Sequence, residues 1–215
     1  MNFNFKIISV FCLVIFFKSF VIAAPPEIAP KKWPCDQVYN PKLDLKALWQ
    51  GPEINDSLKN WWKDDDVIEV VSKLSDPILP EENGTKLIED FAKKYTYFGI
   101  LKKKEQKIKL INLFSGLYQK AADRRNRQYV GIIKFVERQD TIRKTIGSSS
   151  KRLRELRKNN VSQEDPEFIK YSSQMEWNTR VFDQRTRLTE YVCEEPVFLE
   201  QRIGYQARKI LTYLK

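Results

Sequence analysis

The chain has 215 residues, with 38 lysines and arginines against 28 aspartates and glutamates, a net charge of +10 and no histidine. The lack of histidine excludes Ser-His-Asp and Cys-His nucleophiles within one subunit, and it excludes zinc or iron sites with imidazole ligands. The basic balance favours anionic partners, and the length is enough for one domain with a hydrophobic core.

Residues 1–23 have the pattern of a signal peptide. They carry Lys6, no acidic residue, and an apolar run at 7–17 that is too short to cross a bilayer as a helix. Cleavage after Ala23 would remove two lysines and lower the 38 basic residues to 36 against 28 acidic ones, a net charge of +8. The alternative is an uncleaved N-terminal anchor. We therefore expect an exported protein, periplasmic in a bacterium and otherwise secreted.

Cys35 and Cys193 are the cysteine pair that remains once Cys12 leaves with the leader. An exported chain meets an oxidising compartment, in which a disulfide forms and persists. Closing so long a loop removes unfolded-state entropy worth roughly 5 kcal/mol. The alternative is a catalytic redox pair, but the close two-residue spacing that usually tunes a catalytic thiol is missing. The sequence thus predicts a structural disulfide.

Residues 24–54 are rich in proline and show no helical period. Proline donates no backbone hydrogen bond, so the segment is predicted to run as an extended strap across the rest of the protein. Cys35 would pin this strap. Trp33 and Trp49 are expected to cover apolar surface rather than to act as binding anchors.

Residues 55–100 are predicted to form the short helices of a body. Asp56 is expected to cap a first short helix, and the three aspartates at 64–66 place negative charge at the start of a second helix over 67–74. A third helix is expected over 80–95. The aspartates lack the alternating ligands, central glycine and closing glutamate of a calcium loop, so no metal site is predicted.

Residues 101–215 are predicted to form a long antiparallel helical hairpin, because apolar residues recur at spacings of three, four and seven. A single helix over 105–157 would be about 80 Å long. Gly147, with three serines after it, is the weak point where this helix would bend or end. The pair Asp165-Pro166 is a strong start signal for the return helix, and Pro196 is expected to kink or restart it.

The two helices of this hairpin would fold back about a centre near residue 161. That register places Cys193 beside Tyr129 and Gly131, and the segment 134–187 would project as an arm. Several positions facing the opposite helix are polar, so the two helices of the arm should hold each other weakly without a partner. These positions are Gln139, Ser149, Asn178 and Arg185.

Charge is distributed unevenly, with an acidic stretch at 51–92 and a basic stretch at 101–158. Acidic helices packed beside the basic helix, or a solvated basic face, would account for much of this. The predicted tip of the arm is the exception, and its basic residues are expected to contact an acidic protein, anionic lipid headgroups or an envelope polymer. These interaction residues are Lys151, Arg152, Arg154, Arg157 and Lys158. Nucleic acid is not expected, because no aromatic platform accompanies them.

Glu194 and Glu195 are the candidates for carboxylate chemistry, because they adjoin the predicted disulfide and the proline. One of them acting on envelope glycans is the enzymatic alternative. Adjacent helical residues point about 100° apart, so the two are no ready acid and base pair. No glycine-rich phosphate loop appears either. We therefore predict no catalytic residue, no cofactor and no metal.

Four short motifs lie near the two cysteines. They are Trp33-Pro34-Cys35, Trp49-Gln50-Gly51-Pro52, Tyr191-Val192-Cys193-Glu194 and Leu199-Glu200-Gln201-Arg202. In this combination the chain resembles a family of small secreted bacterial helical proteins with no assigned activity. The resemblance covers most of the chain after the leader and implies no reaction, substrate or cofactor. In general character the chain is also similar to periplasmic chaperones with basic helical arms, although it has none of their motifs.

The sequence thus predicts an all-α fold, with a helical body, a long antiparallel two-helix hairpin and an extended N-terminal strap held by a disulfide. The expected function is that of an exported, non-enzymatic interaction or scaffold protein. It would bind a protein partner or an anionic envelope surface through the basic arm. The alternatives are a carboxylate-dependent glycan-cleaving enzyme and a periplasmic holdase chaperone.

Overall fold

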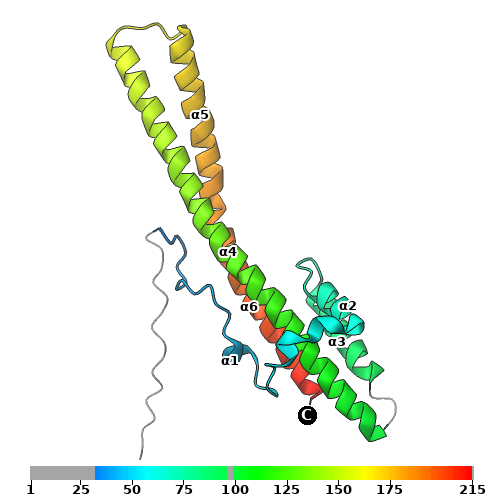
Figure 1. Cartoon of the computed structure of the whole chain (residues 1–215). Helices are drawn as coiled ribbons and strands as arrows, with labels where there is room; N and C mark the ends of the chain where they lie inside the picture. Colours follow the sequence, from blue (N-terminus) through cyan, green and yellow to red (C-terminus); the bar gives the residue numbers. More distant parts are fainter. Residues whose placement is uncertain (1–31, 96–98, 215) are drawn as a thin grey trace, which may run out of the picture.

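The computed structural model of the chain describes residues 32–95 and 99–214 (Figure 1). Its helices are α1 (Leu45–Leu48), α2 (Asp65–Leu74), α3 (Glu81–Lys94), α4 (Gly99–Lys158), α5 (Pro166–Arg187) and α6 (Thr189–Thr212), with 3-10 turns η1 (Ser57–Lys59) and η2 (Trp61–Lys63) before α2. These described ranges contain no strand, which confirms the predicted all-α fold. The predicted leader at 1–23 and the first residues of the strap lie outside them.

α4 is a single helix of 60 residues that runs the length of the hairpin (Figure 1). At 1.5 Å per residue it is about 90 Å long, and it begins earlier than the predicted helix over 105–157. α4 also continues through Gly147, which therefore does not end it. A glycine costs a helix interior only about 1 kcal/mol, and beyond it Leu153 and Leu156 are held by packing on Phe168 of α5.

α5 and α6 return beside α4 in the antiparallel direction, as predicted (Figure 1). Hydrogen bonds join Arg125 to the carbonyl of Pro196 and Gln139 to the carbonyl of Phe182. These pairs confirm the predicted register, with its centre near residue 161.

The returning helix is interrupted at Leu188 and does not restart at Pro196, which corrects the expected place of the restart. The Leu188 N–H bonds to the carbonyl of Arg185, three residues back, and α6 then begins at Thr189. Pro196 lies inside α6 and is buried. A proline removes one helical hydrogen bond. The Pro196 carbonyl also accepts a hydrogen bond of 3.1 Å from Arg125 Nη1, which ties this turn of α6 to α4.

The hydrophobic core lies where α2 and α3 pack against α4 and α6 (Figure 1). Its most deeply buried side chains are Val67, Val71 and Leu74 of α2, Ile88 and Ala92 of α3, Leu110, Leu113 and Phe114 of α4, and Ala207 and Ile210 of α6. α2 begins as predicted, because the Asp64 side chain accepts a hydrogen bond from the Val67 N–H. Asp56 makes no capping bond, and only 3-10 turns follow it, with Trp61 drawn into the core.

The acidic helices do pack beside the basic one. Lys109 of α4 lies 2.7 Å from a carboxylate oxygen of Asp64, and Asp66 accepts hydrogen bonds from the Tyr95 hydroxyl (2.7 Å) and from Lys94 (2.9 Å). The hydrogen bond from Tyr95 and then that from Lys94 lower the pKa of the Asp66 carboxyl. Part of the charge asymmetry in the sequence is therefore neutralised within the body.

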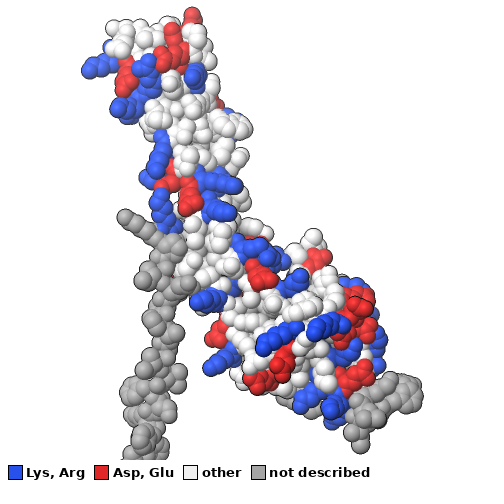
Figure 2. Space-filling view, viewed as in Figure 1, with Lys and Arg blue, Asp and Glu red and all other residues white. Residues whose placement is uncertain are grey.

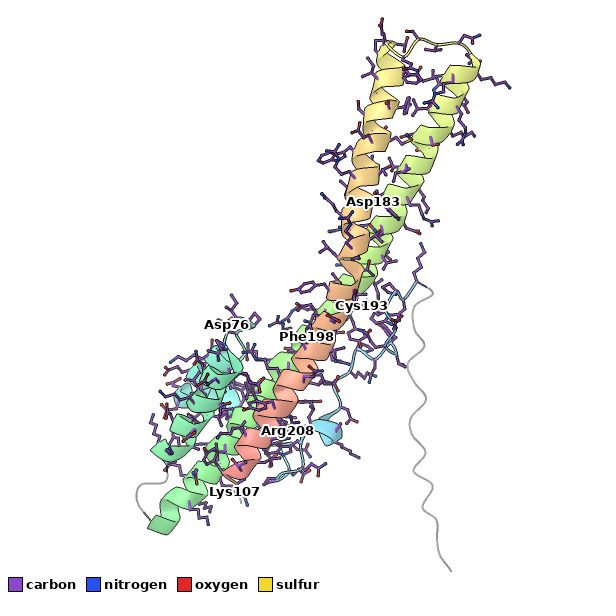
Figure 3. The ribbon with its side chains drawn as sticks, turned by 180° about the vertical axis from the view of Figure 1, so that it is seen from behind. Asp76, Lys107, Asp183, Cys193, Phe198 and Arg208 are labelled. Carbon is purple, nitrogen blue, oxygen red and sulfur yellow. A yellow bond between two sulfur atoms is a disulfide. The ribbon has the colours of Figure 1, made fainter. Side chains whose placement is uncertain are left out.

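The strap, residues 32–54, runs along the hairpin on the side opposite α2 and α3 (Figures 1 and 3). The predicted disulfide between Cys35 and Cys193 is present, with Cα atoms 5.5 Å apart. Trp33 stacks on Tyr129 of α4 with ring centres 5.0 Å apart, and Trp49 stacks on Phe114 in the core at 3.9 Å. Both tryptophans of the strap thus cover apolar surface, as expected.

Two glycines of α4 test how closely the body packs. A Cβ added at Gly116 would lie 2.7 Å from Val71 Cγ2 and 2.8 Å from Trp61 Cε3, whereas one added at Gly147 has no neighbour within 4 Å. Gly116→Ala should therefore lower the free energy of unfolding by about 1–3 kcal/mol, the usual cost of overpacking. Gly147→Ala should raise it by about 0.5–1 kcal/mol, because alanine is the better helix former. Urea unfolding measures the change in the free energy of unfolding for each variant. Changes of the same sign would contradict this packing.

Candidate functional site

A small hydrophobic cluster closes the tip of the arm. Leu153 and Leu156 at the end of α4 pack on Phe168 of α5, and all three are buried. Asn160 adopts the left-handed conformation, with a φ of 56°, in the turn between the helices. Asp165 caps α5 by accepting a hydrogen bond of 2.8 Å from the N–H two residues on. The turn and the start signal indicated by the sequence are therefore both present.

The structure brings the five predicted interaction residues to this tip in two groups. Arg152 lies 2.8 Å from Glu167 and 3.3 Å from Glu155, and the guanidinium of Arg157 lies 5.6 Å from the centre of the Phe168 ring. These two arginines have partners within the tip, so part of the predicted interaction cluster is neutralised internally rather than left for an external partner. The other three are exposed and have no carboxylate partner among the described residues. They form what we name the tip strip: Lys151, Arg154 and Lys158.

The charge of the tip is mixed, with basic and acidic side chains close together (Figure 2). The acidic ones include Glu164, Asp165 and Glu167, which follow the turn on the returning segment. The tip strip is therefore a narrow line of cations beside acidic side chains, and the end of the arm is less basic than the end of α4 suggests.

The predicted polar residues between the two helices of the arm are present, and two of them bond across the seam. Gln139 donates hydrogen bonds to the Phe182 carbonyl and to the Thr186 hydroxyl, and Arg185 donates to Gln139 and to the Phe135 carbonyl. The Arg185 guanidinium also lies 4.2 Å from the centre of the Phe135 ring. Around Gln139 and Arg185 the seam is therefore polar, and its polar side chains are hydrogen-bonded across it.

The other two seam positions behave differently. Ser149 Oγ is buried and has no hydrogen-bond partner among the described residues. Asn178 bonds to the carbonyl of Gln174 on its own helix and not across the seam. Whether the arm is weak without a partner stays a prediction.

The outer face of α5 carries two exposed apolar side chains that sequence reasoning missed. Trp177 is 64% exposed and Ile169 is 51% exposed, both on the arm. A helix that packs on a single neighbour usually keeps such side chains in its buried stripe. The signal was available in the sequence, because neither position fits the apolar spacing of the seam.

Glu194 and Glu195 do not face each other. Glu194 is exposed, whereas Glu195 is partly buried, accepts a hydrogen bond of 3.2 Å from Gln128 and lies 4.0 Å from Arg124. A hydrogen bond from the Tyr191 hydroxyl to Glu195 raises the pKa of that tyrosine. The enzymatic alternative stays a prediction. The two glutamates do not lie together as a pair of catalytic carboxylates.

The concave surface of interest lies at the root of the arm, between the α2–α3 turn, α4 and α6. One hollow of about 480 Å³ and a second of about 360 Å³ share Arg124 and Gln128. We name this surface the root groove. Three of its cations come from α4, and they are Lys120, Arg124 and Arg127. A fourth cation, Arg202, comes from α6, as do the apolar side chains Tyr191 and Phe198, and Ile78 comes from the turn.

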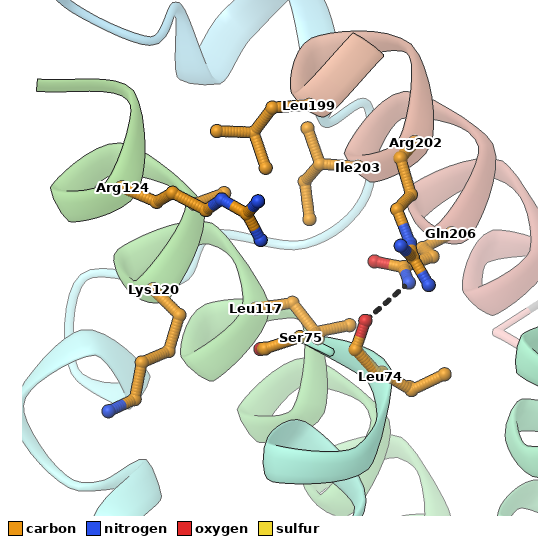
Figure 4. Close-up of a pocket in the computed structure, with 10 residues that line it drawn as sticks. Leu74, Ser75, Leu117, Lys120, Arg124, Leu199, Arg202, Ile203 and Gln206 are labelled. Atoms are coloured by element: carbon orange, nitrogen blue, oxygen red, sulfur yellow. Dashed lines mark hydrogen bonds between the residues drawn. The ribbon is translucent and has the colours of Figure 1, made fainter. Parts of the chain in front are cut away.

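At its lower end the root groove narrows into the body (Figure 4). Arg124 and Lys120 of α4 lie on one side, Arg202 of α6 on the other, and Leu199 and Ile203 line the floor between them. Arg202 donates hydrogen bonds to the carbonyls of the α2–α3 turn, at 3.0 Å and 2.6 Å. These bonds fix the turn against α6 and so fix the end of the groove.

The electrostatics of the root groove are unbalanced toward positive charge. Burial and then repulsion by Arg124 lower the pKa of Arg202, while Asp76 and Glu81 raise it in part. Among the described residues, Glu195 forms an ion pair with a groove cation, at 4.0 Å from Arg124. Lys120 and Arg127 have no such partner there and are exposed.

Comparison of the chain with protein-family models, with curated proteins and with solved structures finds no match. The resemblance to secreted bacterial helical proteins therefore stays a prediction. Within the described ranges, no helix combines the length and the apolar character that a membrane crossing requires. The same residues contain no group of three or more ligand side chains that could hold a metal ion. The disulfide is compatible with export from the cytoplasm.

Proposed function

We propose that this chain is an exported, non-catalytic interaction protein that binds an acidic surface of a protein partner through its hairpin arm. Its proposed location is the bacterial periplasm, with residues 1–23 as the cleaved leader. The observation that carries the proposal is the arm itself, which extends clear of the body and ends in the tip strip (Figures 1 and 2).

The arm stands apart from the rest of the described structure. Beyond Asp140, where Lys32 of the strap forms an ion pair, its two helices project away from the strap and the body (Figure 1). The outward face presents Trp177 and Ile169, and large exposed aromatic side chains are frequent anchors of protein interfaces. An aromatic anchor beside mixed charges suits a protein surface better than a membrane, which favours a uniformly basic patch.

The partner is found by placing the photo-cross-linker p-benzoylphenylalanine at position 177 of the full chain in cells. We expect one main protein to be cross-linked there. The purified protein so identified should then lose at least about tenfold in affinity for Lys151→Glu, Arg154→Glu, Lys158→Glu, because three attractions become repulsions. Titration calorimetry measures this loss, and the melting temperature of the variant should stay nearly unchanged, since all three side chains are exposed.

The matched control makes the same charge change at the far end of α4, away from the arm, with Lys103→Glu, Lys104→Glu and Lys107→Glu, all three exposed. It should bind the partner nearly as wild type does. Equal binding by the tip variant, or no protein cross-linked at Trp177, would reject the proposal. Flotation with phosphatidylglycerol vesicles that requires the tip strip would replace the protein partner with a membrane surface. If wild type and the tip-strip variant suppress the aggregation of an unfolded client equally well, a holdase chaperone would be supported instead.

A further inference from the structure

At the root of the arm, the strap covers one side of the hairpin and leaves the other side open. On one side the strap lies over it, with the disulfide at Cys193, the Trp33 ring on Tyr129, and a hydrogen bond of 3.1 Å from Arg125 to the Asn40 carbonyl. The other side, above the α2–α3 turn, has no covering segment among the described residues (Figure 3). The root groove lies on this uncovered side.

The apolar side chains of the root groove are exposed to an unusual degree. Ile78 is 85% exposed, Tyr191 58% and Phe198 52%. They come from the α2–α3 turn and from two positions about two turns apart on α6, and they line one hollow of about 360 Å³. Apolar side chains that are gathered in a hollow and rimmed by charge mark interaction sites more often than scattered ones do.

The cations of the root groove follow one face of α4, at spacings of four and three residues. Lys120, Arg124 and Arg127 therefore lie in a row along the groove. Glu195 neutralises Arg124 in part, and Arg202 adds a fourth positive charge at the lower end. A ligand that suits this row carries carboxylates at matching intervals.

Continuity with the body indicates the shape of that ligand. Directly below the groove, α2 packs on α4 and α3 packs on α6, so helices already occupy the lower part of the same face. A further helix in line with them would continue this layer toward the arm. Helices that dock in a groove between two others bury one apolar face with anchors at three and four residue spacings.

We propose that the root groove binds an acidic amphipathic helix of a partner protein. Glutamates or aspartates on one side of that helix pair with Lys120, Arg124 and Arg127. Leucine or phenylalanine side chains on the adjoining side pack on Ile78 and Phe198. This site is separate from the tip strip, and neither proposal depends on the other.

The probe is a fluorescein-labelled helical peptide of about 16 residues, which extends roughly 24 Å as a helix. It carries glutamates at intervals of four and three and leucines on the adjoining face. A second peptide has the same sequence in reverse order, because the direction in which the helix lies in the groove is not known in advance. Fluorescence anisotropy with the full chain should show saturable binding by one direction, weakened by added salt because exposed charges are screened. A peptide with glutamine in place of glutamate should bind at least about tenfold more weakly.

Two variants test the two halves of the site. Lys120→Glu with Arg127→Glu removes the charges, and Phe198→Ala removes an apolar anchor, and each should weaken binding of the acidic peptide at least about tenfold. These residues are exposed, so the fold is retained.

The tip-strip variant is the matched control and should bind the peptide as wild type does. The proposal is overturned if no acidic peptide binds, if the glutamine peptide binds equally well, or if both groove variants bind like wild type.

Discussion

Replacing Cys35 and Cys193 together with serine should lower the free energy of unfolding by about 2–5 kcal/mol, one of the two largest changes expected here. The disulfide closes a loop of 158 residues, so its loss releases a large part of the unfolded chain from constraint. It also frees the strap, whose Gln37 side chain donates to the Cys193 carbonyl and whose Trp33 ring stacks on Tyr129.

Guanidinium unfolding of the double variant, compared with wild type, measures this loss. Hydrogen exchange should become faster around residues 35–42 while α2 and α3 stay protected, because Leu43 is the first strap residue that takes part in their core. Wild type with a reductant should approach the variant, and the variant should not respond to reductant. An unchanged free energy of unfolding would show that the strap is held by packing alone.

Replacing Arg125 with methionine should cost about 3–5 kcal/mol, because three acceptors around its buried guanidinium lose their donor, at about 1–3 kcal/mol each. Its side chain is 7% exposed and lies 2.9 Å from Glu200. The guanidinium also donates to the carbonyls of Asn40 and Pro196 and to the Tyr129 hydroxyl. Arg125 therefore ties the strap, α4 and α6 together, and methionine leaves these acceptors without their donor.

Arg125→Lys is the informative companion variant, because it keeps the charge and loses the planar fork of donors. We expect it to be destabilised as well, by less than Arg125→Met. Glu200→Gln should cost least, since Glu200 is 42% exposed. Thermal unfolding of the three variants gives their order. If lysine restored full stability, charge alone would matter and the hydrogen bonds to the strap would not.

The hairpin and the disulfide could be predicted because each depends on a property that the sequence states directly. A run of apolar residues at helical spacing, uninterrupted by proline from residue 102 to the end of α4, admits one long helix. Asp165 and Pro166 marked the start of α5 for the same local reason. With Cys12 in the predicted leader, cysteine pairing had a single solution.

The misses arise where distant segments decide the outcome. Pro196 is buried inside α6, and its carbonyl bonds to Arg125, which is far away in sequence. Arg152 is partly neutralised by Glu167 from the other helix, which a count along α4 does not see. The root groove is lined by side chains from three separate segments, so no local sequence pattern predicts it. Only the exposed apolar positions on α6, outside the seam spacing, offered a hint.

The uninterrupted course of α4 has a geometric consequence. A continuous helix is far stiffer than a flexible linker, so the root groove and the tip strip keep a nearly constant separation. From Arg124 in the root groove to Lys151 in the tip strip, the rise along α4 is about 40 Å. Two molecules bound at the root groove and the tip strip would therefore be held at a set spacing. Lengthening both helices of the hairpin by the same number of residues would increase that spacing by about 1.5 Å per residue.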